Sequence, residues 1–156
     1  MTEKEVYIHE WIQEVSKNRP ELDGFALCPY ASSSKNLIKE TPIDDVVPQS
    51  GYDVIIFIVE DFWRPDRVAR WCEFYNEEYN KYKFLPDCFG KLNEIGGIRS
   101  NNLKYNLILC QSKSKLSKIR KKLMETDYYE YWNETYLKEI LQEDYETFKN
   151  KQNNIN

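Results

Sequence analysis

Hydrophobic residues recur at helical spacing near the start of the chain. A T-x-x-E capping box at Thr2 and Glu5 precedes apolar residues at positions 8, 11, 12 and 15, which fall on one helix face. Asn18 and Pro20 then give a stop signal. The pattern predicts an amphipathic helix over about residues 4–18, followed by an ordered loop.

Two segments are apolar on both faces, which is typical of interior strands. They are residues 52–59 (YDVIIFIV) and 105–111 (YNLILCQ). Residues 35–41 and 84–89 have weaker strand patterns, and Pro86 places the latter at a sheet edge or a bulge. We therefore expect four strands, with residues 52–59 in the interior of the sheet.

Helical spacing returns between and after these strands. A helix with an apolar stripe is predicted from Pro65 to about residue 82, where proline fits the first turn. Ser112 or Ser114 caps a later helix, and Asp127 caps either one last helix or two helices joined near Asn133.

The order of these elements predicts an α+β fold. We expect a mainly antiparallel four-stranded sheet with helices packed on it, and a permuted relative of the ferredoxin-like sandwich is one form this could take. The length of 156 residues suits one domain, over residues 1–149. The end of the chain (KNKQNNIN) is polar, so residues 150–156 are predicted to fray.

Charge and composition restrict the choice of partners. A net charge of −4 disfavours broad binding to nucleic acid or to anionic membranes. The first residues are polar and acidic, and the longest apolar run is too short to span a bilayer. These features predict a cytoplasmic protein, in the host cytoplasm if the gene is viral. Twelve tyrosines and four tryptophans suit either a core or a binding face.

The cysteines do not form a metal motif. They lie at positions 28, 72, 88 and 110, with no C-x-x-C pair and with a single histidine, His9. The sequence therefore predicts neither a metal site nor a cofactor. Cys72 and Cys110 fall on inward faces of their elements, so both are interpreted as small buried hydrophobes. Cys88 lies near a strand end without a partner residue and is interpreted as structural.

Cys28 differs from the others because of the stretch GFALCPYASSS around it (residues 24–34). If a helix begins at Pro29, Cys28 is its N-cap, and the helix N-terminus lowers the pKa of the thiol. Such a thiol could be a nucleophile, a redox centre or a metal ligand. As a nucleophile it could have His9 as its base. The alternative is that the sulfur packs beneath the first helix.

The motif resembles two kinds of protein. CPYA is similar to the active-site tetrapeptide of glutaredoxins and omega-class glutathione transferases, but Val47-Pro48 follows it too soon for a thioredoxin-like fold. A second resemblance combines Trp11-Ile12 and Val15 with Gly24-Phe25-Ala26-Leu27-Cys28-Pro29-Tyr30-Ala31. These residues resemble a small bacterial domain family of unknown function, which has a tryptophan helix before a G-x-x-L-C-P-F-A segment. Similar short proteins occur in cyanobacterial phages, and this resemblance implies a fold relation without a defined activity.

The loop Gly96-Gly97-Ile98-Arg99-Ser100-Asn101-Asn102 is a second candidate site. Glycines allow close approach of a ligand, Arg99 could bind an anion, and Asn101 and Asn102 offer donors and acceptors. Together with Tyr30 beside Cys28, these side chains form the predicted ligand-binding set. The alternative is a hairpin loop without a function.

A basic segment from Lys113 to Lys122 precedes an acidic final region. It could contact RNA or an acidic partner, but the cations are not interleaved with stacking aromatics. The alternative, which we favour, is that the two helices complement each other in charge.

Two functions follow from these candidates. The first is a small viral or bacterial accessory protein that binds a small molecule or a host protein without catalysis. The second is a thiol-dependent enzyme that uses Cys28 and His9, with Arg99 and Asn102 orienting a small anionic substrate. A pocket joining Cys28 to His9 or Arg99 would favour the enzyme, and an exposed apolar patch without a pocket would favour a protein partner.

Overall fold

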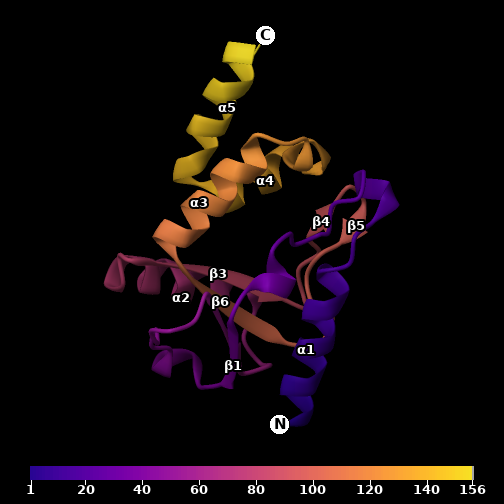
Figure 1. Ribbon diagram of the computed structural model, residues 1–156. Coiled ribbons are helices and arrows are strands. Elements are labelled where there is room, and N and C mark those ends of the chain that lie inside the picture. Colours follow the sequence, from indigo (N-terminus) through magenta and orange to yellow (C-terminus); the bar gives the residue numbers. More distant parts are fainter. Residues whose placement is uncertain (156) are drawn as a thin grey trace.

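A mixed four-stranded sheet lies at the centre of the protein, with helices on both of its faces (Figure 1). The computed structural model describes residues 1–155. The α-helices and strands, in chain order, are α1 (Glu3–Val15), β1 (Asn36–Glu40), β2 (Val54–Val59), α2 (Pro65–Glu78), β3 (Tyr82–Cys88), β4 (Glu94–Ile95), β5 (Ile98–Arg99), β6 (Asn106–Ser112), α3 (Lys113–Met124), α4 (Glu134–Leu141) and α5 (Glu143–Ile155). Short 3₁₀ turns are η1 (Pro20–Leu22), η2 (Ala31–Ser33), η3 (Ile43–Asp45) and η4 (Tyr128–Tyr131).

The strand order is β1-β2-β6-β3, which confirms the α+β class and the interior position of β2. β6 pairs antiparallel with β2 and with β3, so that β2, α2 and β3 form a split βαβ unit around β6. Pro86 lies on the edge strand β3, as expected.

The sheet is mixed rather than antiparallel throughout, because β1 pairs with β2 in parallel. Residues 41–53 pass from the end of β1 back to the start of β2 through η3 rather than through a tight turn. This crossover is fixed at Ile43, whose amide donates to the Glu60 carboxylate (2.8 Å) and whose carbonyl accepts from the Tyr75 hydroxyl (2.6 Å).

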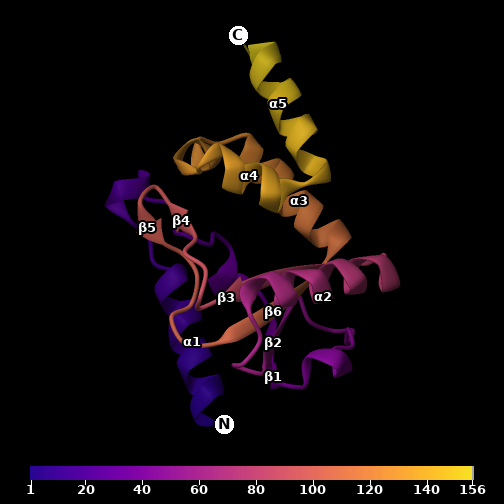
Figure 2. The same cartoon turned by 180° about the vertical axis from the view of Figure 1, so that it is seen from behind.

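Alternate residues of β2 serve the two faces of the sheet. Ile55, Phe57 and Val59 pack in one cluster with Val68 and Cys72 of α2. Figure 2 shows α2 lying across this face. Cys72, Cys88 and Cys110 are all buried, which agrees with the interpretation of the three cysteines as structural.

The opposite face has two separate helical covers. Ile8 of α1 packs on Ile56, Ile58 and Leu107. The second cover is the region from α3 to α5, which has its own cluster (Leu123, Met124, Tyr128, Tyr129, Leu137, Leu141 and Phe148). Figure 1 shows α3, α4 and α5 at the end of the molecule opposite to the N-terminus, with α5 projecting outward.

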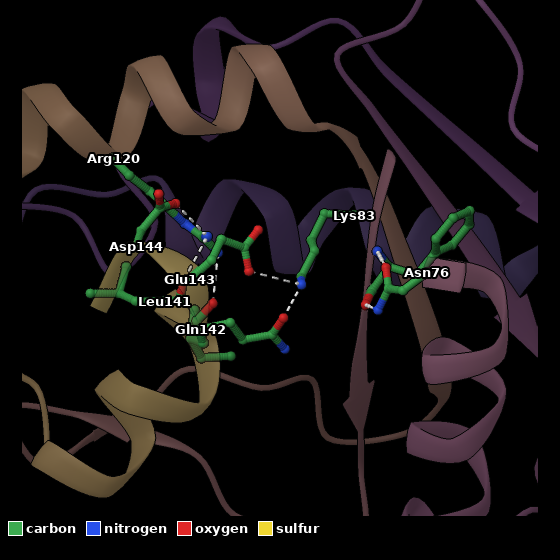
Figure 3. A network of polar contacts seen from close by, with 9 residues as sticks. Asn76, Lys83, Arg120, Leu141, Gln142, Glu143 and Asp144 are labelled. Atoms are coloured by element: carbon green, nitrogen blue, oxygen red, sulfur yellow. Dashed lines mark hydrogen bonds and ion pairs between the residues drawn. The ribbon is translucent and has the colours of Figure 1, made fainter. Parts of the chain in front are cut away.

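A polar network fixes the second cover to the sheet (Figure 3). Lys83 of β3 is 6 % exposed, donates to the Gln142 side chain and lies 3.5 Å from the Glu143 carboxylate. Arg120 of α3 pairs with Asp144 at 3.1 Å. The charge complementarity predicted between the basic segment and the acidic final region is therefore present in one ion pair, Arg120–Asp144, whereas Lys115 of that segment pairs with Asp53.

Several helix ends differ from the sequence prediction. α1 ends at Val15 rather than near residue 18, because the chain turns to form a bridge between Asn18 and Ala26. Two final α-helices are present, but they meet at Gln142 rather than near Asn133, and Asp127 precedes only the short turn η4. Asn133 instead caps the start of α4 by accepting from two backbone amides. Residues 150–155, which we expected to fray, continue α5, and residue 156 lies outside the described residues.

In the described chain, no helix combines the length and apolarity needed to cross a bilayer.

Candidate functional site

The Cys28 segment does not form the predicted helix start. The Cys28 amide donates to the carbonyl of Val15 (2.9 Å), which ties the segment to the end of α1. Tyr30 then adopts a left-handed backbone conformation (φ 73°), and only the short turn η2 follows. The prediction that Cys28 is a helix N-cap is wrong, because a helix cannot run through a left-handed residue.

Cys28 and Tyr30 instead lie at a cavity of about 480 Å³. Its floor is the sheet face that α1 and the C-terminal helices leave between them, contributed by β2, β6 and β3. One wall is formed by α1 and the Cys28 segment, and the other by α3, η4 and α4. The apolar and aromatic residues that line it include Trp11, Ile12, Val15, Leu27, Tyr30, Val54, Ile56, Leu85, Leu109, Ile119, Leu123, Tyr128, Tyr129, Trp132, Tyr136 and Ile140.

Aromatic rings form much of the second wall. Trp132 and Tyr136 stack with ring centroids 4.9 Å apart, and Tyr128 meets Trp132 edge to face at 5.9 Å. The Tyr128 hydroxyl donates to the carbonyl of Leu27 (2.6 Å), which joins this wall to the Cys28 segment. This hydrogen bond connects the two walls directly, and the stacked rings pack the second wall.

The thiol of Cys28 is not acidic. Burial among the surrounding protein atoms raises its pKa to about 11, and the carboxylate of Asp87 adds to the effect. The Cys28 residue as a whole is exposed and lines the cavity, so the increase in pKa comes from the protein atoms packed around its thiol. The expected decrease in its pKa is therefore wrong, since the helix N-terminus that would stabilise a thiolate is missing.

Alkylation kinetics test this environment directly. At pH 8, Cys28 should react with iodoacetamide about 100-fold more slowly than a free cysteine of ordinary pKa, because about one thiol in a thousand is ionised. The rate should increase tenfold per pH unit up to about pH 10. Peptide mapping by mass spectrometry measures it, and a rate that levels off below pH 9 would contradict the raised pKa.

Asp87 is a cavity residue that the sequence analysis missed. It follows Leu85 on the same face of β3, and its Oδ1 accepts from the backbone amide and the side-chain amide of Asn102 (2.9 and 2.8 Å). Burial raises the pKa of its carboxyl to about 6, although the Asn102 hydrogen bonds and the Arg99 charge oppose that shift. A carboxyl in a mostly apolar cavity is a typical ligand-orienting group.

The other predicted site residues lie away from the cavity. His9 is exposed on α1, and Arg99 donates to the carbonyl of Phe89 (3.0 Å). Asn101 is buried and donates to the carbonyls of Cys88 and Lys91, while Asn102 bonds to Asp87 and to the backbone at Tyr105. The structure thus brings Cys28 and Tyr30 to the cavity and gives Asn102 a supporting position beside Asp87.

The missed aromatic residues carried a signal in the sequence. Residues 128–136 (YYEYWNETY) contain five aromatic side chains in nine positions, which is dense even for this chain. Within residues 1–155, no three His, Cys, Asp or Glu side chains gather as a metal-binding group. The absence of a metal and of a cofactor stays a prediction.

Comparisons with known proteins give no relative for this chain. No family model matches it, and no match was found among curated proteins or among solved structures. The resemblance of the Cys28 segment to a bacterial and phage domain family therefore stays a prediction, and the function has to be inferred from the cavity itself.

Proposed function

We propose that this protein binds a small, largely apolar molecule in the cavity between the sheet and its two helical covers, without catalysis. The observation that carries the proposal is the cavity, because its volume of about 480 Å³ lies within the range typical of small-molecule sites. Its lining is mostly apolar and aromatic, with a few polar groups that can orient a ligand.

A concave site supports a small molecule over a host protein. The walls come from segments that converge around one volume, whereas a protein partner more often uses a flat or exposed surface. An accessory role in the cytoplasm of a bacterial or virus-infected cell extends this proposal and is based on composition and motif alone.

The thiol-dependent enzyme has less support. Cys28 is accessible, but its pKa of about 11 leaves it protonated near neutral pH. Neither His9 nor Arg99 is among the residues that line the cavity, so the proposed base and the proposed anion-binding group are not beside the thiol. A binding role requires neither group.

A neutral fluorescent probe tests the proposal. N-phenyl-1-naphthylamine becomes brighter in apolar sites, and we expect the protein to bind it with one site per chain. Leu109→Trp should weaken this binding at least tenfold, because Leu109 lines the cavity and the indole would fill it. Leu103→Trp is the matched control, since Leu103 is 61 % exposed and does not line the cavity.

The result is interpretable only for folded variants, so circular dichroism and thermal unfolding accompany the titrations. Equal probe binding by wild type and by folded Leu109→Trp would place the probe elsewhere and contradict the proposal. Absence of any saturable binding would do the same.

A further inference from the structure

We infer that the cavity takes a small organic cation, an amine with an aromatic or branched aliphatic body, and that its ammonium group pairs with the carboxylate of Asp87. This inference rests on the proposed function and specifies its ligand. The inference follows from a comparison of the charged side chains that line the cavity, most of which already have a partner of opposite charge or are exposed to solvent.

Most of the charged lining residues are already paired or solvated. Asp53 pairs with Lys115 at 2.5 Å, and Arg120 pairs with Asp144 at 3.1 Å. Lys118 is exposed. Asp87 differs, because no cationic group of residues 1–155 lies within ion-pair distance of its carboxylate.

The hydrogen bonds of Asp87 leave one oxygen available. Oδ1 accepts from the backbone N–H and from the side-chain amide of the neutral Asn102, and no described donor bonds to Oδ2. This arrangement orients the carboxylate and leaves one acceptor for a ligand N–H group. Arg99 acts on Asp87 only over a longer distance, because its guanidinium donates to the carbonyl of Phe89.

Asp87 also lies close to the residues that would surround a ligand. Its negative charge contributes to the raised pKa of the Cys28 thiol and of the Tyr136 phenol, one on each wall of the cavity. A cation placed beside Asp87 would therefore lie between the Cys28 segment and α4, near the stacked pair of Trp132 and Tyr136.

The aromatic lining favours the same ligand charge. Trp11, Tyr30, Tyr128, Tyr129, Trp132 and Tyr136 all line the cavity. The faces of such rings attract ammonium groups, and the attraction increases when water is excluded. A carboxylate in an apolar cavity is costly without a partner, so a cation is stabilised there, whereas an anion is repelled. Carboxylate and rings together therefore select an ammonium group on an apolar body.

Calorimetry with matched probes tests this inference. 1-Naphthylmethylamine and 1-naphthalenemethanol share an aromatic body and differ in charge, since the amine is protonated at pH 7.5. We expect wild type to bind the amine at least tenfold more tightly than the alcohol. Asp87→Asn should remove this preference and change the affinity for the alcohol less than twofold. Asp53→Asn, a lining carboxylate with its own lysine partner, should keep the preference.

The outcomes separate the ligand class from the binding role. Equal affinities for amine and alcohol in wild type would overturn the inference and leave the binding role intact, provided that N-phenyl-1-naphthylamine still binds. Loss of the preference in Asp53→Asn but not in Asp87→Asn would show that the ammonium group pairs with Asp53, and would overturn the inference. Absence of binding by all three probes would overturn both. The wild-type comparison decides the matter even if Asp87→Asn fails to fold.

Discussion

Replacing Arg120 with alanine should lower the free energy of unfolding by about 3 kcal/mol, the lower end of the cost of breaking a buried ion pair. Arg120 is 4 % exposed and lies where α3, α4 and α5 meet (Figure 3). Its guanidinium donates to the Ile140 carbonyl (2.8 Å) and to Asp144 (3.1 Å). Alanine would leave a carboxylate and the last carbonyls of α4 without their donor. We choose the lower end because Asp144 retains some solvent access.

Urea denaturation at pH 7.5 measures this effect, and two variants control it. Lys121→Ala, next to Arg120 but exposed, should change stability by less than about 0.5 kcal/mol. Arg120→Lys should recover only part of the loss, because an ammonium cannot reproduce the fork of donors. A cost for Arg120→Ala as small as that for Lys121→Ala would show that the network does not hold the C-terminal helices in place.

The interior of the fold could be predicted from the sequence because its strands are apolar on both faces. This pattern located β2 and β6, and Pro86 identified β3 as an edge strand. The direction of β1 could not be predicted in the same way. It depends on residues 41–53, whose path is set by contacts of Ile43 with Glu60 and Tyr75, and these contacts join segments far apart in the chain.

The candidate site was only partly predictable. The Cys28 segment drew attention for its supposed helix start, and it does lie at the cavity, yet the left-handed Tyr30 prevents that helix. Whether a residue such as tyrosine accepts a positive φ depends on its surroundings, and here the Tyr30 carbonyl accepts from the backbone of Ser33 and from the Ser34 hydroxyl.

Polar side chains gave the least reliable signal. Asn101 and Asn102 looked like ligand donors, but their amides bond mainly to nearby backbone groups. Asparagine serves loop structure as readily as binding, so the residue type alone cannot distinguish the two. Asp87 showed no signal in the sequence, because its importance comes from its place on the cavity floor. The walls around it are formed by α1 and the Cys28 segment, which precede it in the chain, and by α3, η4 and α4, which follow it.

The stability of the protein should depend on pH through Asp87 in a direction opposite to that of a salt-bridged carboxylate. The native pKa of about 6 exceeds the ordinary value of 3.8, so the native state binds more protons than the unfolded state between these values. The ionised carboxylate therefore destabilises the fold above pH 6, and this penalty is relieved as the pH falls through 6 toward 4.

Asp87→Asn isolates this contribution. The amide keeps an oxygen for the two Asn102 donors but does not ionise, so the variant should be more stable than wild type at pH 8. Between pH 8 and pH 4.5 this advantage should shrink by about 2 kcal/mol, since each pKa unit corresponds to about 1.4 kcal/mol and the titration is incomplete at the lower pH. Urea denaturation of both proteins at several pH values measures the difference.

A carboxylate that lowers stability without a partner is typical of a site retained for function rather than for folding. Asp53→Asn provides the opposite case, because Lys115 lowers the pKa of Asp53 and its contribution to stability should be lost as the pH falls. Asp87 would be an ordinary structural residue if Asp87→Asn were less stable than wild type at pH 8. The same would follow if the difference in free energy of unfolding between the two proteins did not change with pH. In the expected case, a bound amine would stabilise wild type at pH 8 more than it stabilises Asp87→Asn, because the variant binds the amine only as weakly as the alcohol.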